Sequence, residues 1–477
     1  MERRVLLAIF LCFLVIYVWQ ALVVRPQQER AAAVAEEAAR NATEPGAAAA
    51  LAPGGPAGSP SALVPPPAPD AATPAPVLGD TSERDIRIET ADVTAVLTNR
   101  GGRLKSWRLK RYFDQNNEPL ELVATSAASQ PLPFSLRVDD AAVTAELNSA
   151  LYTVSGAPPG GPLAGPADLT FEYRDTAGLH ALKRFHFEAR SYLVTFQASV
   201  SAGDRDLSPA IVWGPAVGDA EPPSRVTQKP GALLSSAGKE QRLAAAAITK
   251  APAYEGDYKY AGVDDHYFLT VALDLGRAKV SYQPLSIPPG PGTEEEAREL
   301  MAYAVQPAQS NQPVKFYIGP KDFDELASID REFVRAINFG IWSFICVPLL
   351  RTLKWIHGYV GNYGWSIIVF TVILNLIIFP LRHKSVVAMR KMQEIQPEVK
   401  AIQDRYSKLK KTDPARQKMN GEMMELYKQR GVNPAAGCVP MLLPFPILIA
   451  FYSLLATAIE LRGAPFMLWI HDLSAPD

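Results

Sequence analysis

The chain has 477 residues, a formal net charge of −1 and a charged fraction of 20%, while 48% of its residues are hydrophobic. A nucleic-acid-binding protein carries a basic excess, so this charge balance excludes that class. The charged fraction is also too high for a protein embedded entirely in a membrane, so a soluble region is expected.

An apolar run at residues 5–24 follows Arg3 and Arg4 near the N-terminus. Its 20 residues are enough to span a bilayer and exceed the core of a usual signal peptide. We predict an uncleaved transmembrane anchor at residues 1–25 with its N-terminus in the cytosol. A cleavable signal peptide stays open as the alternative, because an Ala-rich stretch follows Arg30.

Residues 26–82 are rich in Ala and Pro and contain few large apolar side chains. Such a segment buries too little surface to fold, so it is predicted to be a disordered linker.

Residues 83–320 contain short segments of alternating apolar and polar residues, separated by Gly and Pro. The clearest segments are 86–88, 93–97, 134–138, 169–173, 185–187, 194–200 and 267–273. This pattern predicts one large antiparallel β-sandwich domain. The three cysteines are Cys12, Cys346 and Cys438, so a disulfide scaffold is excluded in this domain.

Residues 321–360 contain an apolar stretch at 336–350 that is too short to span a membrane comfortably. Polar and aromatic residues accompany it: Trp342, Arg351, Lys354, Trp355, His357 and Tyr359. We predict a helix that lies in the periplasmic membrane interface. An extra transmembrane helix is the alternative, but it would place the basic segment downstream outside the cell, which the positive-inside rule disfavours.

Two further apolar runs, at residues 365–381 and 439–461, have 17 and 23 residues. The shorter run rises about 26 Å as a helix, close to the ~30 Å thickness of the hydrocarbon core. We therefore predict transmembrane helices at 361–381 and 439–461, followed by a periplasmic segment at 462–477.

Polar residues recur within these two runs at helical spacing. The first set is Thr371, Asn375 and Arg382, and the second is Ser453, Thr457 and Glu460. Each set falls on one helix face, because its members are separated by whole helical turns. Hydrogen bonding between helices explains such residues, and so does a hydrated groove that receives a substrate.

The segment at residues 382–438 is basic and predicts a cytosolic helical hairpin. Its first arm has apolar residues at alternating steps of three and four: Met392, Ile395, Val399, Ile402, Tyr406 and Leu409. A breaker at residues 411–414 precedes a second amphipathic arm. Five methionines lie here, at Met389, Met392, Met419, Met423 and Met424. They suit contact with apolar partners, and packing within the hairpin is the alternative.

Several long motifs together resemble the YidC/Oxa/Alb family, in the Gram-negative form with a large periplasmic domain. They are Gly361-Asn362-Tyr363-Gly364-Trp365-Ser366, Phe379-Pro380-Leu381, Val432-Asn433-Pro434, Gly437-Cys438-Val439-Pro440 and Trp469-Ile470-His471-Asp472-Leu473-Ser474. The resemblance implies a multidomain, multi-pass protein of the bacterial inner membrane. It implies a periplasmic antiparallel β-supersandwich, similar in fold to sugar mutarotases, and an α-helical transmembrane core with a cytosolic hairpin.

The same resemblance implies a membrane insertase and chaperone that performs no bond chemistry and needs no cofactor or metal. The implied partners are nascent membrane proteins, the lipid bilayer, the Sec translocon, and the ribosome or signal recognition machinery. The implied substrate groove contains Thr371, Asn375, Arg382, Ser453 and Thr457, and the hairpin methionines would contact the arriving chain.

Three features depart from the family pattern. The family commonly has an arginine at the position of Asn375, and we expect Arg382 to supply part of the missing charge by extending along the helix. Pro444 stands where relatives often have a polar residue. The family continues into further membrane helices after the last motif, so we expect the sequence to be a fragment.

A membrane-tethered carbohydrate-binding or mutarotase-like protein is the rival interpretation. Its acid and base candidates are His180, His186, Asp264, Asp265 and His266. The alternation around His186 favours the solvent-facing side of a strand, and the pattern at residues 264–266 favours a turn.

Overall fold

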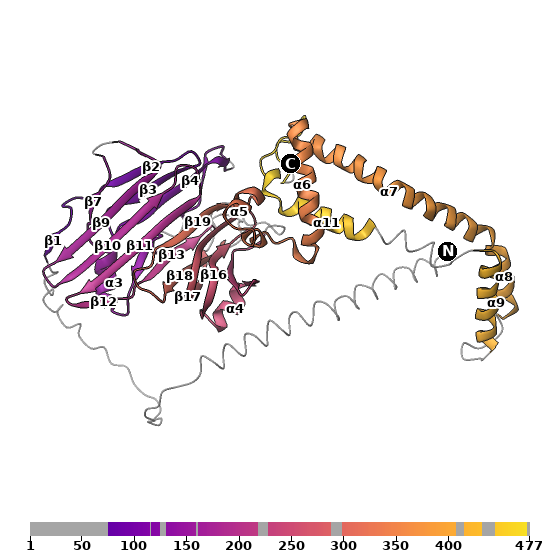
Figure 1. Cartoon of the computed structure of the whole chain (residues 1–477), viewed down its shortest axis with the longest axis horizontal. Coiled ribbons are helices and arrows are strands. Elements are labelled where there is room, and N and C mark those ends of the chain that lie inside the picture. The colour runs from indigo at the N-terminus through magenta and orange to yellow at the C-terminus, as the bar shows by residue number, and fades with distance from the viewer. Residues whose placement is uncertain are drawn as a thin grey trace, which may run out of the picture. The chain divides into compact units, whose positions relative to one another are not determined.

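The computed structural model of the chain describes residues 75–114, 116–124, 130–158, 161–217, 228–287, 298–406, 415–431 and 444–474. The predicted N-terminal anchor, most of the predicted linker and the first residues of the second apolar run lie outside these residues. The chain divides into two compact units, Met1–Pro320 and Lys321–Asp477, which are described separately (Figure 1).

The described part of the first unit contains two β-sheets and two short helices (Figure 1). In the described residues the larger sheet has 14 strands: β1 (Pro76–Leu78), β6 (Ser135–Arg137), β7 (Thr153–Ser155), β9 (Ala167–Asp175), β10 (Leu179–Phe187), β11 (Leu193–Ala202), β12 (Arg205–Leu207), β13 (Ala210–Ala216), β14 (Gly231–Ser236), β15 (Lys239–Leu243), β16 (Ala253–Asp264), β17 (Phe268–Ile287), β18 (Arg298–Pro307) and β19 (Val314–Pro320). The smaller sheet has five: β2 (Asp85–Glu89), β3 (Val93–Thr98), β4 (Arg103–Phe113), β5 (Pro119–Glu121) and β8 (Leu163–Ala164). The helices are α3 (Ala141–Ser149) and α4 (Ala245–Lys250).

Alternation of apolar and polar residues explains why these segments are strands. Along β10 and β11 every second side chain is buried, as expected where one face of a sheet covers a core. Each of the seven predicted segments overlaps a strand, although Phe134, Val138 and Tyr267 lie just outside theirs, so the prediction of a β-rich domain is confirmed. Adjacent strands pair antiparallel except β8, which runs parallel to β2.

The two sheets are joined through Trp107 of β4. Its indole N–H donates to the carbonyl of Ile318 on β19 over 2.9 Å, and its ring stacks on Phe187 of β10 with the centroids 6.4 Å apart. The ring is almost fully buried. A buried indole that satisfies its donor in the opposite sheet both fills the core and fixes how the sheets meet.

A cluster of buried aromatic rings from strands of the larger sheet surrounds Phe134. Phe134 is fully buried with a left-handed backbone, φ +65°, and the rings around it are Phe185, Phe196, Trp213 and Phe316. The buried Lys183 amine donates to the Phe134 carbonyl over 2.7 Å and to the Gly101 carbonyl over 2.6 Å. Lys183 therefore stabilises a strained segment that sequence periodicity does not reveal.

The second unit is helical. Its helices are α5 (Phe323–Ile329), α6 (Ser343–Val360), α7 (Tyr363–Glu394), α8 (Gln396–Arg405), α9 (Ala415–Gln429) and α11 (Pro444–Thr457), with 3₁₀ turns η2 (Phe333–Ala336), η3 (Gly340–Trp342) and η4 (Ile459–Leu461).

Helix α6 differs from the helix predicted at residues 336–350. The apolar stretch is interrupted by 3₁₀ turns and by Gly340 at φ +61°, so the helix begins at Ser343 and continues through the basic residues to Val360. Its buried face is Cys346, Leu350, Leu353 and Ile356. Hydropathy alone misplaced the bounds of this helix, because its buried face continues past residue 350 into a segment with polar residues between the buried positions.

Helix α7 joins the predicted membrane run to the first part of the hairpin in one helix of 32 residues. The helix ends at Glu394, Ile395 follows as its C-cap, and Pro397 occupies the first turn of α8. The helix is therefore interrupted within the predicted seam, although Met392, Ile395 and Val399 of the seam still pack together. Proline lacks the N–H that would continue the α7 ladder but suits the start of a new helix.

Helix α11 ends at Thr457, four residues before the predicted end of the second membrane helix. Among the residues that the structure describes, one helix is long and apolar enough to cross a membrane, with the apolar segment at Tyr363–Pro380. The described part of α11 is apolar but shorter.

A cluster of charges around Lys354 of α6 connects three segments of the helical unit. The Lys354 amine lies 3.2 Å from a Glu460 carboxylate oxygen in η4, 2.5 Å from Asp324 and 3.8 Å from Asp322 at the start of α5. The Glu460 side chain is only 7% exposed. Burial lowers the pKa of Lys354, but the three carboxylates outweigh burial and raise this pKa above its ordinary value. The amine is therefore charged and holds α5, α6 and η4 together.

Replacing Lys183 by Met should change how stability depends on pH. Burial, followed by the charge of Arg103, lowers the pKa of Lys183 well below its ordinary value of 10.5. The unfolded chain then binds more protons than the folded chain, so the free energy of unfolding rises as pH increases from the lowered pKa toward 10.5. Urea unfolding of wild type and Lys183→Met at a series of alkaline pH values should show this rise in wild type alone. A difference between the two proteins that does not vary with pH contradicts the prediction.

Replacing Lys354 by Gln should destabilise the helical unit by roughly 3 kcal/mol, since it leaves the buried Glu460 carboxylate without its cation. Glu460→Gln added to Lys354→Gln should restore part of this loss, because the uncompensated charge is then removed. Thermal unfolding in detergent of wild type, both single variants and the double variant measures the coupling. Additive effects of the two substitutions would show that the pair does not interact energetically.

Candidate functional site

The turn between α6 and α7 sets where the candidate site begins. Gly361 has φ +74°, the left-handed conformation that favours glycine, and its N–H donates to the His357 carbonyl over 2.8 Å. Asn362 then caps α7, since its side-chain oxygen accepts from the Trp365 N–H over 3.2 Å. Two adjacent residues thus end one helix and start the next.

Three polar side chains lie along the exposed face of α7, and we call Thr371, Asn375 and Arg382 the polar ladder. The Thr371 hydroxyl donates to the Ile367 carbonyl over 2.7 Å, and the Asn375 amide donates to the Thr371 carbonyl over 2.8 Å. A guanidinium N–H of Arg382 donates to the Asn375 side-chain oxygen over 3.4 Å. The structure therefore brings together the three residues that the sequence placed on one face.

The polar ladder is surrounded by exposed apolar side chains of the same helix. They are Val372, Leu376, Ile377 and Phe379, each more than half exposed. An exposed polar side chain on an apolar helix can satisfy its donors with the backbone of the same helix, as Thr371 and Asn375 do. Arg382 keeps further N–H donors for another acceptor.

The second predicted set divides in the structure. Ser453 and Thr457 lie half-buried on α11, whose buried residues Ala450 and Leu454 are adjacent to them on the helix surface. Helix α11 packs on α6, where the Cys346 thiol donates to the Ala450 carbonyl over 3.2 Å. Glu460 leaves this set, because the chain departs from the helix at Ala458 and turns Glu460 toward Lys354.

Helices α7 and α11 meet at Phe370 and Phe451, whose rings stack with centroids 5.3 Å apart. Within the described ranges no hydrogen bond joins Ser453 or Thr457 to the polar ladder. The prediction that the two sets line one groove therefore stays a prediction.

The hairpin helices α8 and α9 pack through Ile395 and Val399, which are buried. Met392 and Met423 lie against them, so two of the five predicted methionines serve hairpin packing. Met419 is half-buried, whereas Met389 and Met424 are 46% and 61% exposed. The five methionines therefore do not form one surface.

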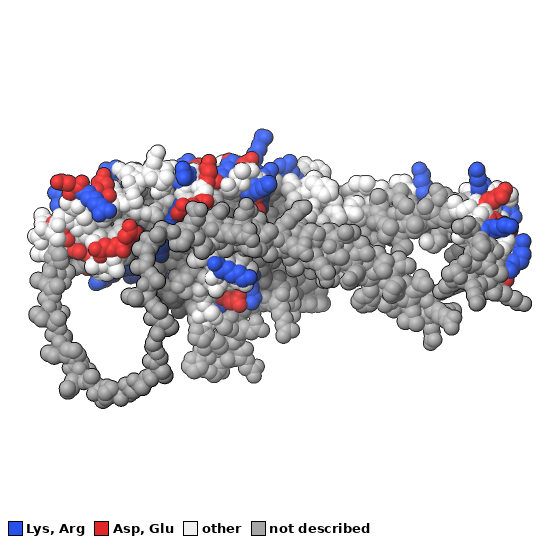
Figure 2. Space-filling model, turned by 90° about the horizontal axis from the view of Figure 1, so that it is seen from below, with Lys and Arg blue, Asp and Glu red and all other residues white. Residues whose placement is uncertain are grey.

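An ion pair and a hydrogen bond near the two ends of α8 hold the antiparallel arrangement of α8 and α9 in the hairpin. Arg430 lies 2.6 Å from Glu398, and the Tyr406 hydroxyl donates to Glu422 over 2.7 Å. Figure 2 shows lysines and arginines gathered on the hairpin, with acidic side chains between them. The described basic side chains of the hairpin are therefore exposed, while Glu398 and Glu422 each bind a residue of the opposite arm.

The residues of the rival carbohydrate interpretation do not form one site. His180 and His186 pair with Glu172 and Asp168 across strands β10 and β9, over 2.9 and 2.8 Å. Three strands, β11, β19 and β17, separate β10 from β16, where Asp264 lies.

The Asp-Asp-His segment has structural roles. Asp264 is fully buried and accepts from Arg242 over 3.1 Å. Asp265 accepts from the N–H groups of Tyr267 and Phe268 over 2.9 and 2.7 Å, which closes the turn into β17. The His266 ring accepts from the Gln228 N–H over 3.3 Å. The turn expected from the sequence is therefore confirmed.

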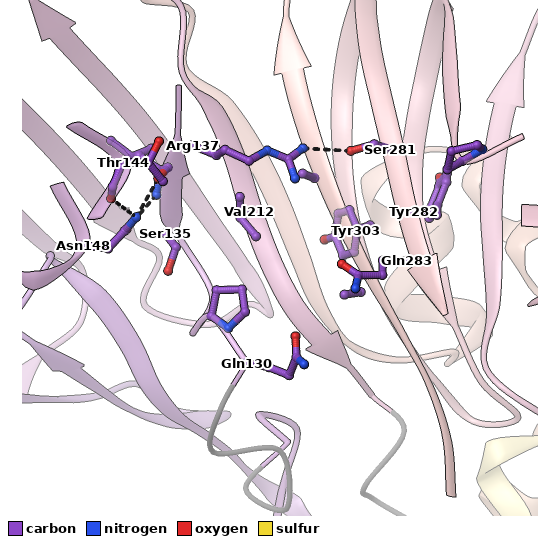
Figure 3. Close-up of a pocket in the computed structure, with 15 residues that line it drawn as sticks. Gln130, Ser135, Arg137, Thr144, Asn148, Val212, Ser281, Tyr282, Gln283 and Tyr303 are labelled. Carbon is purple, nitrogen blue, oxygen red and sulfur yellow. Dashed lines mark hydrogen bonds between the residues drawn. The ribbon is translucent and has the colours of Figure 1, made fainter. Parts of the chain in front are cut away.

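A cavity of about 420 Å³ lies in the β domain, over strands β6, β13, β17 and β18 (Figure 3). Arg137 reaches across one side of it and donates to the Ser281 hydroxyl over 3.1 Å. Its described lining includes neither Asp nor Glu, so these residues offer no carboxylate for acid or base catalysis. Nowhere in the described ranges do three or more His, Cys, Asp or Glu residues meet in a way that would hold a metal ion.

Sequence reasoning missed two residues that position the candidate site. Asn362 caps α7, and its side-chain N–H group also donates to the Pro465 carbonyl over 2.9 Å, which ties the segment after α11 to the start of α7. An asparagine directly after a helix-ending glycine is a readable capping signal, but its contact over 103 residues is not. Lys354 looked like one more interfacial cation, because its partners are distant in sequence.

Comparisons with known proteins agree with the sequence motifs. The family model described as YidC periplasmic domain matches residues 85–352, and the one described as 60Kd inner membrane protein matches residues 355–477. The membrane protein insertase YidC of Pelobacter propionicus is 32% identical, covering 100% of this chain and 84% of the relative. The Campylobacter jejuni insertase YidC is 47% identical over 161 residues, 34% of this chain and 29% of the relative.

Among solved structures, a crystal structure of an active YidC insertase has 17% identity and a TM-score of 0.26, covering 84% of this chain and 79% of that one. A galactose mutarotase-like protein from Lactobacillus casei has 10% identity and a TM-score of 0.31, covering 50% of this chain and all of the other. Scores this low carry no argument about arrangement. The two family models and the full-length relatives are sufficient: this chain belongs to the YidC family of membrane protein insertases.

Proposed function

We propose that this protein assists the insertion and folding of proteins in the bacterial inner membrane, through a partly hydrated groove beside the polar ladder. The observation that carries the proposal is a ladder of polar side chains on the exposed face of an apolar helix, in a member of a family of insertases. A plain membrane anchor does not need such a ladder, because polar groups in lipid cost free energy.

The driving force for insertion resides in the substrate. An apolar residue at the centre of a helix gains about 0.3 to 0.6 kcal/mol on entering the bilayer, so a segment of about 20 residues needs no nucleotide. The barrier is the passage of the polar residues that flank this segment. A groove that offers hydrogen bonds and water part of the way across lowers that barrier.

Arg382 is the residue best placed to attract a polar or acidic flank. It follows Asn375 by two helical turns, about 10 Å along the axis, yet its guanidinium group reaches the Asn375 side chain. A long side chain that extends along its helix in this way delivers its charge toward the middle of the span. This geometry supports the hypothesis that Arg382 supplies the charge at a position where the family commonly has arginine and this chain has Asn375.

The remaining predicted groove and hairpin residues complete the proposal. Ser453 and Thr457 would face the substrate from α11, and the exposed Met389 and Met424 offer soft apolar contacts to an arriving segment. Met392, Met419 and Met423 would act mainly through the packing of the hairpin. The Sec translocon and the ribosome or signal recognition machinery are the partners that membership of the family suggests.

The proposed topology places the hairpin in the cytosol and the β domain in the periplasm, with membrane spans at residues 1–25, 361–381 and 439–461. The excess of cations in the hairpin supports this orientation. The length and apolar character of the Tyr363–Pro380 segment support one of the spans directly.

Asn375→Leu should reduce insertion of substrates with charged flanks several-fold while the folded protein keeps its thermal stability, because leucine removes both the acceptor for Arg382 and a polar group of the groove. Ile373→Leu is the matched control, since it also places leucine on the exposed surface of α7 but leaves the ladder intact. Insertion into vesicles per folded molecule measures the effect. Equal insertion by both variants, with lower stability for Asn375→Leu, would mean that the ladder only stabilises the helix.

Single cysteines in a cysteine-free background should establish the topology. Lys279→Cys on β17 should react with a membrane-impermeant maleimide in intact spheroplasts, and Lys428→Cys on α9 should react only after the membrane is opened. Both positions are exposed in the structure, so a lack of labelling reports the membrane and not burial. Labelling of Lys428→Cys in intact spheroplasts would refute a cytosolic hairpin.

A further inference from the structure

The segment after α11 folds into a tight loop at residues 464–473. The Phe466 N–H donates to the Ile470 carbonyl over 3.1 Å, and the Leu473 N–H donates to the Ala464 carbonyl over 3.2 Å. The Ile470 N–H closes the tip by donating to the Met467 carbonyl over 3.2 Å. These bonds make the loop a defined unit and not an irregular tail.

The tip of this loop exposes three apolar side chains in succession. Met467 is 44% exposed, Leu468 is 72% exposed and Trp469 is 68% exposed. Leu468 has φ +59°, a left-handed backbone that a leucine rarely adopts. No charged residue lies between Gly463 and Ile470 in the sequence. A strained backbone that holds large apolar side chains in solvent calls for a function.

The base of the loop is fixed to the first turn of α7. The Asn362 side chain donates to the carbonyls of Pro465 and Phe466 over 2.9 and 3.3 Å. The Phe466 ring packs against Trp365 and so closely over Gly364 that an added Cβ there would lie 2.1 Å from it. The height of the loop along α7 is therefore set by the structure.

The loop lies at the same end of α7 as three exposed aromatic rings, which we call the aromatic collar. Trp365 in the first turn of α7 is 47% exposed, and Trp355 and Tyr359 near the end of α6 are 61% and 77% exposed. Beyond Trp365 toward the C-terminal end of α7, the exposed apolar surface continues through Ile368 and Val369. Trp and Tyr rings concentrate where a membrane protein passes from hydrocarbon to headgroups.

We propose that Met467, Leu468 and Trp469 form a lipid-binding tip, inserted at the boundary between headgroups and acyl chains of the leaflet in which α7 begins. The continuity of the tip with the exposed apolar surface of α7 identifies lipid as its occupant. The aromatic collar and the tip together would fix the depth of α7, and with it the depth of the polar ladder. This role goes beyond the proposed insertase activity and does not depend on any substrate.

The test places a fluorescent label that reports polarity at Leu468→Cys in the full chain, with the native cysteines replaced by serine. The protein is reconstituted in vesicles of phosphatidylethanolamine and phosphatidylglycerol that carry nitroxide quenchers either near the headgroup or near the end of the acyl chain. The label at position 468 should be quenched about twofold more strongly by the shallow nitroxide, as expected for a side chain at the interface. Aqueous iodide should quench it only weakly.

Two matched label positions make the outcome interpretable. A label at Lys279→Cys in the β domain should respond to iodide alone, and a label at Leu376→Cys in the middle of α7 should respond most to the deep nitroxide. Trp469→Cys supplies a second tip position if the first variant does not fold, as judged by thermal unfolding.

Each remaining outcome overturns a specific claim. Strong quenching of position 468 by iodide would place the tip in water, and protection from every quencher would mean that protein covers it. Either result rejects the lipid-binding tip while Leu376 still reports a membrane-spanning α7. Iodide quenching at Leu376 would instead refute the proposed span, which distinguishes failure of the proposed function from failure of this inference.

Discussion

The helical unit depends on one constraint: a polar group on an apolar helix must find its hydrogen-bond partner within the protein. Thr371 and Asn375 meet this constraint by donating to carbonyls one turn earlier in α7. Arg382 then uses the Asn375 oxygen that remains. Among the residues that the structure describes, these three side chains therefore bond within α7 itself, and the guanidinium of Arg382 lies on an exposed face.

Short connections with specific chemistry position this face. Gly361 and Asn362 reverse the chain between α6 and α7, and Asn362 also binds the segment that follows α11. Lys354 connects α5 and η4 to α6 by charge. Helix α6 packs on both α7 and α11 and therefore acts as the scaffold on which the two apolar helices are arranged.

Much of the architecture follows from sequence, and the exceptions have physical causes. Alternating residues predicted β10 and β11, because one face of each strand is buried. The shared face of Thr371, Asn375 and Arg382 followed from helical spacing alone. The start of α6 was misplaced because Gly340 and 3₁₀ turns interrupt an otherwise apolar stretch. Glu460 was misassigned because spacing assumes a continuous helix, and its true partner, Lys354, is 106 residues away.

The continuity of α7 has a mechanical consequence. Its 32 residues extend about 48 Å, well beyond the ~30 Å of a hydrocarbon core, so the same helix reaches from the aromatic collar into the hairpin. Pro380 removes one backbone hydrogen bond from this helix, and a proline is a position at which helices bend most easily. The hydrogen bond from Arg382 to Asn375 spans the position of this proline on the helix. Because α7 is continuous from Tyr363 to Glu394, a displacement of its hairpin end by a bound chain would carry the charge of Arg382 with it.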